Sequence, residues 1–327
     1  MTAPWADRLA ERFGSRLMRD VALAKYTSAR IGGPADFLLV AKSGDDLADI
    51  VAQLWQADAP FVVVGAGSNV LVSDLGCREV VVLNHARRVE IRPLGEDKRR
   101  ALLWAESGAS LGGTARSAAQ QGWSGIEWGA TVPGTIGGAV VGNAGAFGGD
   151  MAGSLHMANI LQRGNQQVGS NSTAVVATVA VRDLGYSYRS SRLKRERGSA
   201  VVLSAEFVLT ACPPAEALAR IETMNSKRRE SQPPGASMGS MFKNPPGDFA
   251  GRLIEAAGLK GVRIGGAEVS SVHANFFINT GGATAADVRS LMTRAQEAVL
   301  EKSGVRLDPE VELIGEWPSQ GMGAEDA

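Results

Sequence analysis

Hydrophobic positions in the first third of the chain alternate between helical and extended spacing. Residues 45–55 predict an amphipathic helix, because their apolar positions recur at i, i+3, i+4 and i+7. These positions are Leu47, Ile50, Val51 and Leu54. Residues 61–74 predict a strand, a glycine loop and a second strand, and residues 78–84 predict another strand. Residues 95–110 begin with charges and predict an exposed turn followed by a strand.

The middle of the chain is rich in glycine and then in short β-branched runs. Residues 125–150 hold so many glycines that no regular helix or strand is expected to run through the whole segment, which predicts a shaped loop. From about residue 157 to 210 the pattern predicts short strands, among them 172–184 and 199–211.

The last hundred residues predict longer helices between short strands. A helix over 213–230 begins at prolines, and a domain boundary is expected near it. A helix over 247–259, ended by Gly258, precedes a strand over 273–279, and residues 305–317 close the pattern with a strand.

A long helix is predicted over residues 284–304. Thr284 and Asp287 have the spacing of a capping box at its start, and Gly304 is a natural C-terminal stop. One apolar face is formed by Val288, Leu291, Met292 and Ala295. The last residues, 318–327, show no pattern and are expected to be a loose tail.

Composition limits the classes of function. The chain has 327 residues, of which 44% are hydrophobic, so two or three domains are expected. Lys plus Arg and Asp plus Glu are equal at 34 each, so no global field favours nucleic acid or an anionic membrane. Any anionic ligand must therefore be held by local groups.

The cysteines and the N-terminus indicate a cytoplasmic protein. Cys77 and Cys212 lie far apart without a C-x-x-C pattern, so we expect two inert thiols, no disulfide framework and no metal site. The first residues, "MTAPWADRLAERFG", carry charges where a signal peptide would be apolar, and no later run is long enough to span a bilayer.

Three glycine loops are the clearest candidate binding feature. "GAGSN" (65–69) exposes backbone N–H groups that suit a pyrophosphate, although by itself a tight turn between strands explains it better. It differs from the dinucleotide fingerprint, because "NVLVSD" follows as strand. "PGTIGG" (133–138) and "GNAGAFGG" (142–149) add two further glycine surfaces, and together the three favour a large flat cofactor.

Seven motifs, in order, resemble the UDP-N-acetylenolpyruvoylglucosamine reductase (MurB) family over nearly the whole chain. They are "TSARIGGPAD" (27–36), "GAGSNVLVSD" (65–74), "VPGTIGGAVVGNAGAFG" (132–148), "YSYRSS" (186–191), "GSMFKNP" (239–245), "IEAAGLKGVRIGGAEVSSVHANFFIN" (254–279) and "LDPEVELIGEW" (307–317).

The resemblance implies an α+β fold of two subdomains of the vanillyl-alcohol-oxidase type that bind FAD non-covalently, followed by a C-terminal α+β substrate-binding domain. The expected limits are 1–85 and 86–212 for the two subdomains and 213–317 for the C-terminal domain. It also implies a reaction in peptidoglycan precursor synthesis, and hence in cell-wall growth, cell shape and cell division. NADPH reduces the flavin, which then passes hydride to a UDP-sugar enolpyruvyl ether and yields UDP-N-acetylmuramate.

The resemblance also implies roles for particular residues. Ser240 corresponds to the family's proton donor, because hydride addition to the enol ether requires an acid rather than a nucleophile. Arg189 and Glu310 correspond to the enolate stabilisers, and Glu310 must then hold or share a proton. Substrate contacts are expected from Tyr188, Lys243 and Asn244. Cofactor contacts are expected from Gly65, Ala66, Gly67, Ser68, Asn69, Pro133, Gly134, Thr135, Gly137, Gly138 and Arg228.

Read in isolation, the same residues have simpler explanations. Ser240 would be a turn cap, and Arg189 and Glu310 would be surface charges. Arg229 is as good a candidate as Arg228 for the cofactor phosphate from spacing alone, and His273 is expected to be a core or turn residue.

The chain departs from the family pattern in two places. The family usually has arginine two residues after the catalytic glutamate, where this chain has Glu312, which changes the electrostatics there. The stretch between Arg189 and Ser240 is too short for the tyrosine-bearing loop of some members, so the chain resembles the shorter type.

Two other functions remain as alternatives. A flavin oxidoreductase on the same scaffold could act on another substrate, although "GSMFKNP" and "PEVELIG" match the murein enzyme. A catalytically silent flavin or UDP-sugar binding protein would be expected to lack one of Arg189, Ser240 and Glu310, and all three are present. A monomer or weak oligomer is expected.

Overall fold

The computed structural model describes residues 4–164 and 174–318, and its chain divides into two compact units. Of the described residues, unit 1 comprises 4–18, 38–68, 81–164 and 174–234, and unit 2 comprises 19–37, 69–80 and 235–318. Each unit is therefore assembled from segments that are far apart in the sequence.

The helices of the described residues are α1 Ala6–Phe13, α2 Gly44–Gln56, α3 Leu111–Gln120, α4 Ile136–Gly142, α5 Met151–Ser154, α6 Arg192–Arg195, α7 Pro214–Ser231, α8 Ala250–Ala256 and α9 Ala285–Ser303. Short 3-10 turns are η1 Gly14–Arg16, η2 Leu23–Tyr26, η3 Glu127–Thr131 and η4 Val181–Leu184.

The strands are β1 Met18–Ala22, β2 Pro34–Ala41, β3 Phe61–Val64, β4 Val70–Val72, β5 Cys77–Asn84, β6 Val89–Leu94, β7 Arg100–Glu106, β8 Trp123–Ser124, β9 Gly145–Ala146, β10 Gly149–Asp150, β11 Leu155–Arg163, β12 Ala174–Ala180, β13 Ala200–Ala211, β14 Arg263–Ile264, β15 Ala267–Val269, β16 Phe277–Asn279 and β17 Glu312–Ile314.

Unit 1 is built on an antiparallel sheet of order β12-β11-β13-β7-β6, with β8 also paired to β13. The small residue Ala205 of β13 lies opposite Ala158 of β11 and Ala105 of β7 at the centre of this sheet. Apolar side chains of α3 and α4 pack with the sheet residues in one buried cluster. This core supports the loops on either side of α4.

A second sheet has the order β1-β2-β5-β3, and its strands β2 and β5 each pass from one unit into the other. Helix α2 follows β2 and packs against β13 and β11. Ser43 caps α2 by accepting a hydrogen bond from the Asp46 N–H, a favoured start for a helix.

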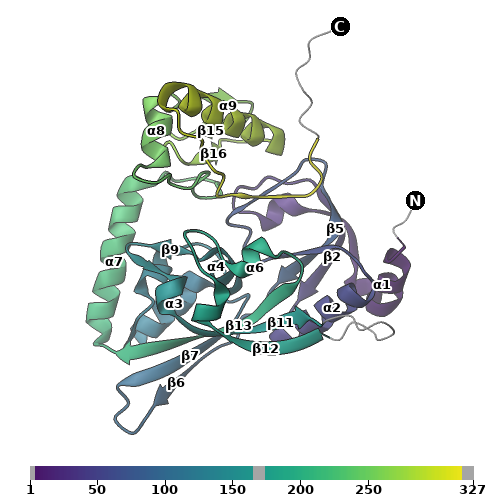
Figure 1. The fold of residues 1–327 in the computed structure, drawn as a ribbon, viewed down its shortest axis with the longest axis vertical. Helices are drawn as coiled ribbons and strands as arrows, with labels where there is room; N and C mark the ends of the chain where they lie inside the picture. Colours follow the sequence, from purple (N-terminus) through teal and green to yellow (C-terminus); the bar gives the residue numbers. More distant parts are fainter. Residues whose placement is uncertain (1–3, 165–173, 319–327) are drawn as a thin grey trace. The chain divides into compact units, whose positions relative to one another are not determined.

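Unit 2 contains a three-stranded antiparallel sheet, β14-β15-β16, with α8 and α9 (Figure 1). Its buried cluster includes Phe242 and Phe277 together with Val288 and Leu291 of α9. Strand β17 pairs in parallel with β4, with Glu312 opposite Val70, which brings residues 312–314 against residues 70–72. Among described residues, no helix has the length and apolar character needed to cross a bilayer.

Most of the predicted elements are confirmed. Helix α2 covers the predicted 45–55, α7 covers 213–230, and β5 and β13 match 78–84 and 199–211. The long helix α9 is also confirmed in detail. Thr284 and Asp287 form the capping box, Gly304 ends the helix in the left-handed conformation, and the predicted apolar face is buried.

Other predictions were incomplete, or gave elements longer than those in the structure. The prediction for 125–150 as a shaped loop was incomplete, because η3 and the seven-residue helix α4 form within it. The predicted strand 273–279 is limited to β16, since the residues before it turn sharply, and the predicted strand 305–317 is limited to β17. The predicted helix 247–259 shortens to α8.

The prediction for 172–184 also needed correction, because β12 ends at Ala180 and η4 follows it. Residues 172 and 173, and all but Pro318 of the predicted tail, lie outside the described residues. The domain limits expected at 85, 212 and 317 stay predictions.

Candidate active site

Two of the predicted cofactor loops lie against each other in unit 1. The Ser68 hydroxyl donates a 3.2 Å hydrogen bond to the Pro133 carbonyl. A Cβ atom added to Gly65 would lie 2.4 Å from Thr135 Oγ1, and one added to Gly134, whose φ is +125°, would lie 2.9 Å from Ser68 Oγ. Glycine is therefore required where the loops touch, and the two loops form one surface.

This loop surface suits an anionic group. The backbone N–H groups of Ala66, Gly67 and Ser68 donate hydrogen bonds to no other described residue. Consecutive free N–H groups of this kind make a concave anion-binding nest. Thr135 caps α4, because its hydroxyl accepts from the Gly138 N–H at 3.4 Å. The residues present thus fit the pyrophosphate of a dinucleotide cofactor such as FAD.

Arg189 stands at the tip of a tight turn in unit 1. The backbones of Ser187 and Ser190 exchange two hydrogen bonds, of 3.0 and 3.1 Å, so that Tyr188 and Arg189 form the turn between them. Arg189 has φ +53°, a left-handed conformation that is uncommon for arginine. Its guanidinium donates to the Gly145 carbonyl at 3.0 Å and lies 5.3 Å from the centre of the Tyr188 ring. Tyr188 itself is 54% exposed.

The Arg189 turn is anchored to the end of α4. The Tyr186 hydroxyl donates to the Val140 carbonyl at 2.9 Å, and the Ser191 hydroxyl donates to the Val141 carbonyl at 2.7 Å. The Asn143 amide donates to the Ser187 carbonyl at 3.0 Å. The hydroxyls of Tyr186 and Ser191 satisfy carbonyls that the end of α4 leaves unpaired, so the arginine turn is fixed to this short helix.

Ser240 and Glu310 are brought together by main-chain pairing in unit 2. Ser240 bridges to Phe276, and Phe242 bridges to Pro309. Within this arrangement the Glu310 N–H donates to the carbonyl of Met241, the residue after Ser240, at 2.8 Å. Both Met241 and Phe242 are fully buried, which gives the Ser240 segment a rigid support.

Asn69 is tied to the Glu310 segment. Its side-chain N–H donates to the Glu310 carbonyl at 3.1 Å, and its own carbonyl accepts from the Glu312 N–H at 3.0 Å. Residues 65–68 and 133–138, with Arg189 and Arg228, belong to unit 1, whereas Asn69 belongs to unit 2. The predicted cofactor loop 65–69 therefore ends at a residue that braces Glu310.

Lys243 and Asn244 follow Ser240 in unit 2. The Lys243 ammonium forms a 2.6 Å ion pair with Asp308, whose side chain is 67% exposed. An exposed pair of this kind is weak, so the lysine can exchange it for a ligand phosphate. The side-chain Oδ1 of Asn244 accepts a 3.0 Å hydrogen bond from the Ala250 N–H, at the start of α8.

Arg228 and Arg229, which the sequence could not distinguish, have different surroundings on α7. Arg229 is exposed and pairs with Glu222 at 2.6 Å. Arg228 is half-buried, its guanidinium contacts no partner among the described residues, and desolvation lowers its pKa. A partly desolvated, unpaired guanidinium favours an anionic ligand, which makes Arg228 the better candidate.

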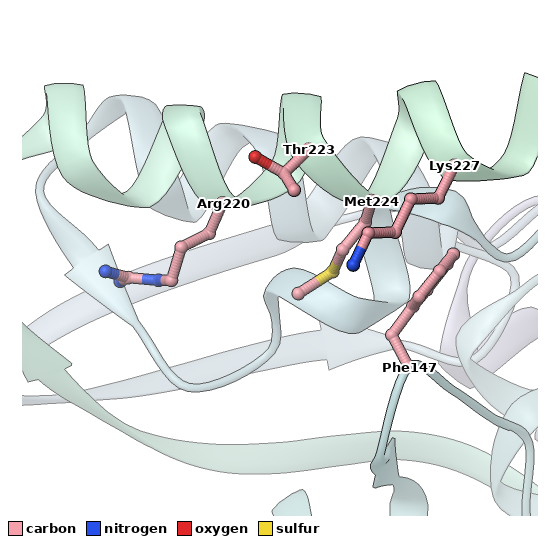
Figure 2. Close-up of a pocket in the computed structure, with 5 residues that line it drawn as sticks. All are labelled: Phe147, Arg220, Thr223, Met224 and Lys227. Atoms are coloured by element: carbon pink, nitrogen blue, oxygen red, sulfur yellow. The ribbon is translucent and has the colours of Figure 1, made fainter.

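A cavity of 290 Å³ lies beside α7 in unit 1, and sequence reasoning did not identify it. Figure 2 shows its lining, in which Phe147 faces side chains from one side of α7. The helix contributes Arg220, Thr223, Met224 and Lys227. These residues follow the i, i+3, i+4, i+7 spacing, which is the only signal that the sequence offers.

The cavity combines an aromatic ring with positive charge. Phe147 has φ +51°, is 45% exposed and lines the cavity. Lys227 contacts no partner among the described side chains. Burial alone would raise the pKa of Glu127, but hydrogen bonds from Gly125, Arg220 and Ser124 lower it, so Arg220 remains paired with a carboxylate.

The surroundings of Cys77 and His273 indicate structural and not catalytic roles. Burial raises the pKa of the Cys77 thiol to about 11, so the thiol stays protonated and unreactive near neutral pH, as expected. His273 packs against Phe276 with ring centres 5.0 Å apart, and its Nδ1 accepts from the Asn275 N–H at 3.2 Å. This agrees with the prediction of a turn histidine.

Comparisons with known proteins cover both parts of the chain. A family model described as an FAD binding domain matches residues 35–162, and one described as the C-terminal domain of UDP-N-acetylenolpyruvoylglucosamine reductase matches residues 231–314. The chain is 42% identical over 295 residues to UDP-N-acetylenolpyruvoylglucosamine reductase of Chloroflexus aggregans, with 89% of this chain and 95% of that protein covered.

The Rubrobacter xylanophilus protein of the same name is 42% identical over 297 residues, covering 91% and 95% of the two chains. Among solved structures, the MurB enzyme from Thermus caldophilus is similar with a TM-score of 0.74 and 33% identity, covering 91% of this chain and 99% of that one. The predictions of an α+β FAD-binding fold with a C-terminal domain, and of FAD as cofactor, are confirmed.

Proposed function

The chain belongs to the UDP-N-acetylenolpyruvoylglucosamine reductase family, and we propose that it reduces UDP-N-acetylglucosamine enolpyruvate to UDP-N-acetylmuramate with NADPH. The observation that carries this proposal is the similarity to these reductases over nearly the full length of both chains. The product is a precursor of peptidoglycan, and the substrate is a UDP-sugar.

The glycine loops of unit 1 hold the cofactor in this proposal. Bound FAD supplies the hydride chemistry between NADPH and the enolpyruvyl group. The N–H groups of residues 66–68 bind the pyrophosphate, and Arg228 adds a positive charge to a phosphate. Gly137 is packed too closely on Ser107 for a side chain, which keeps the surface next to α4 flat.

Ser240 donates the proton. After hydride addition, the neighbouring carbon of the former enol ether must be protonated, so a hydroxyl that gives up its proton is needed at that carbon. The bridge from Ser240 to Phe276 and the buried Met241 support a fixed serine backbone. A serine is a weak acid, so its effectiveness depends on this fixed position.

Arg189 and Glu310 stabilise the charge that develops on the substrate. Arg189 carries a permanent positive charge on an anchored turn, which suits the carboxylate and the enolate oxygen. Glu310 assists only with a proton on its carboxyl group, because an ionised carboxylate would repel the enolate. Its backbone position is supported by hydrogen bonds from Asn69 and to Met241.

The nucleotide part of the substrate is bound by a cationic, a polar and an aromatic side chain. Lys243, Asn244 and Tyr188 contact the UDP-sugar, with Lys243 leaving Asp308 for a phosphate. The reaction takes place in the cytoplasm, and the enzyme acts as a monomer or weak oligomer.

The test follows the flavin directly. The purified protein is loaded with FAD, reduced anaerobically with NADPH, and mixed with UDP-N-acetylglucosamine enolpyruvate while the flavin absorbance is recorded. Rapid return of the oxidised spectrum with formation of UDP-N-acetylmuramate is expected. A protein that stays reduced would point to another substrate, and a protein that cannot be loaded with FAD would reject the proposal.

A further inference from the structure

The side chain of Asn275 binds the main chain of the Ser240 segment. Asn275 is 3% exposed. Its Oδ1 accepts a 3.0 Å hydrogen bond from the Phe242 N–H, and its Nδ2 donates a 2.8 Å hydrogen bond to the Phe242 carbonyl. Because Phe242 is fully buried, its N–H and its carbonyl need hydrogen-bond partners within the protein. The Asn275 amide supplies both.

The backbone of Asn275 also bonds Met241, the residue before Phe242. Its carbonyl accepts from the Met241 N–H at 2.8 Å, and its N–H donates to Nδ1 of His273 at 3.2 Å. Asn275 thus holds two consecutive residues that directly follow Ser240. A slip of this segment by one residue would break all of these bonds at once.

The other side of the same segment carries Glu310. The Met241 carbonyl accepts from the Glu310 N–H at 2.8 Å, and the Lys243 N–H donates to the Asp308 carbonyl at 2.8 Å. Residues 241–243 therefore lie between Asn275 and residues 308–310, with each neighbour contributing backbone hydrogen bonds.

We propose that Asn275 is a positioning residue, which sets the Ser240 segment in the register that places the Ser240 hydroxyl against the substrate beside Glu310. This rests on the proposed function of Ser240 as proton donor. Among the described residues, the Asn275 side chain bonds only the backbone of Phe242 and so acts through the main chain. Proton transfer needs a donor within hydrogen-bond reach of the carbon, so a small shift of Ser240 slows this step specifically.

Two variants test the amide itself. Asn275→Ala removes both hydrogen bonds, whereas Asn275→Asp keeps the acceptor for the Phe242 N–H and loses the N–H donor. The lost donor returns as an O–H group when the aspartate carboxyl is protonated. Asn279→Ala is the matched control, because Asn279 is another amide of unit 2 whose side chain bonds Ala29, Gly281 and Ala283 instead.

Anaerobic stopped-flow absorbance separates flavin reduction by NADPH from reoxidation by the enolpyruvyl substrate. In Asn275→Ala we expect unchanged flavin reduction and reoxidation slowed about a hundredfold, the cost of a misplacement of about 1 Å. Asn275→Asp should be slow at high pH and recover toward the wild-type rate as the pH falls. Asn279→Ala should reoxidise as fast as the wild type even if it unfolds at a lower temperature.

Several results would overturn the proposal. Reoxidation at the wild-type rate in both Asn275 variants would do so, and so would slowing of both half-reactions to the same extent, or equal slowing in Asn279→Ala. If Asn275→Ala does not fold, Asn275→Asp decides, and a slow rate that does not recover at low pH counts against the proposal. A wild-type enzyme that is not reoxidised by the substrate would instead reject the proposed function, and the role of Asn275 with it.

Discussion

The N–H of Glu310 donates a 2.8 Å hydrogen bond to the carbonyl of Met241, the neighbour of Ser240. The two proposed catalytic residues of unit 2 are therefore linked through the main chain. Substitution of either side chain leaves this backbone contact in place. Such variants can be interpreted as changes in chemistry with little change in position.

Ser240→Ala is expected to separate the two half-reactions. Flavin reduction by NADPH should persist, because it needs no proton from Ser240. Reoxidation by the enolpyruvyl substrate should slow about 10²- to 10⁴-fold, the usual contribution of a positioned acid. Stopped-flow absorbance measures both rates.

The control for this prediction is Ser237→Ala, a serine of the same loop to which the proposed mechanism assigns no role. It should keep both rates. Equal slowing of both half-reactions in Ser240→Ala, or no slowing, would show that Ser240 is not the proton donor.

Arg228→Gln is expected to weaken FAD binding, and Arg229→Gln is its matched control. A hydrogen bond to a charged group contributes about 1.5–3 kcal/mol, which corresponds to roughly a 10- to 150-fold rise in the Kd for FAD. Arg229 is exposed and bonds Glu222 and Ser226 of its own helix, so its loss should change the Kd little.

Titration of the apoprotein with FAD, followed by flavin fluorescence, measures both constants. An unchanged Kd in Arg228→Gln with a raised KM for the UDP-sugar would assign Arg228 to the substrate phosphates. If neither the Kd for FAD nor the KM for the UDP-sugar changes, the half-buried Arg228 guanidinium binds neither ligand and has a structural role.

Asp74→Ala is expected to destabilise unit 2. Both oxygens of Asp74 accept 2.8 Å hydrogen bonds at the start of α9, from the N–H groups of Ala285 and Ala286. Loss of a helix-capping carboxylate costs about 0.5–2 kcal/mol. Urea denaturation should therefore show a lower transition midpoint.

Asp97→Ala provides the comparison, since Asp97 is 65% exposed in a turn of unit 1. A surface change of this kind is expected to stay within about 0.5 kcal/mol. If both variants unfold at the same urea concentration, the hydrogen bonds of Asp74 add nothing to the stability of α9.

His273 is expected to make folding sensitive to acid. Desolvation lowers its pKa below the ordinary value of 6.5, Lys260 lowers it further, and Glu255 opposes this in part. The unfolded chain therefore takes up this proton at a higher pH than the folded chain does. The stabilisation is present above about pH 6.5 and is lost as the pH falls through the lower folded value.

The measurement compares the wild type with His273→Gln, which removes this titration. Burial also lowers the pKa of His85, so the wild-type curve alone contains two contributions. The difference in free energy of unfolding between the two proteins should shrink as the pH is lowered from 7 to 5. A constant difference would mean that His273 does not titrate in this range.

The sequence by itself determined the elements whose signals are local. Helix α9 was predicted with its capping box and its glycine stop, because side chains three or four residues apart create these signals. The order of motifs also identified the family, the cofactor and the reaction, since each glycine loop and the Ser240 stretch is an unbroken run of residues.

Only the tertiary structure decided which distant segments share a unit. Asn69 and Glu310 are 241 residues apart and bonded, β4 pairs with β17, and residues 19–37 and 69–80 belong with residues 235–327. The choice of Arg228 over Arg229 likewise depended on burial and on the ion pair of Arg229. These features arise from long-range backbone pairing and desolvation, which leave no periodic pattern in the sequence of either partner.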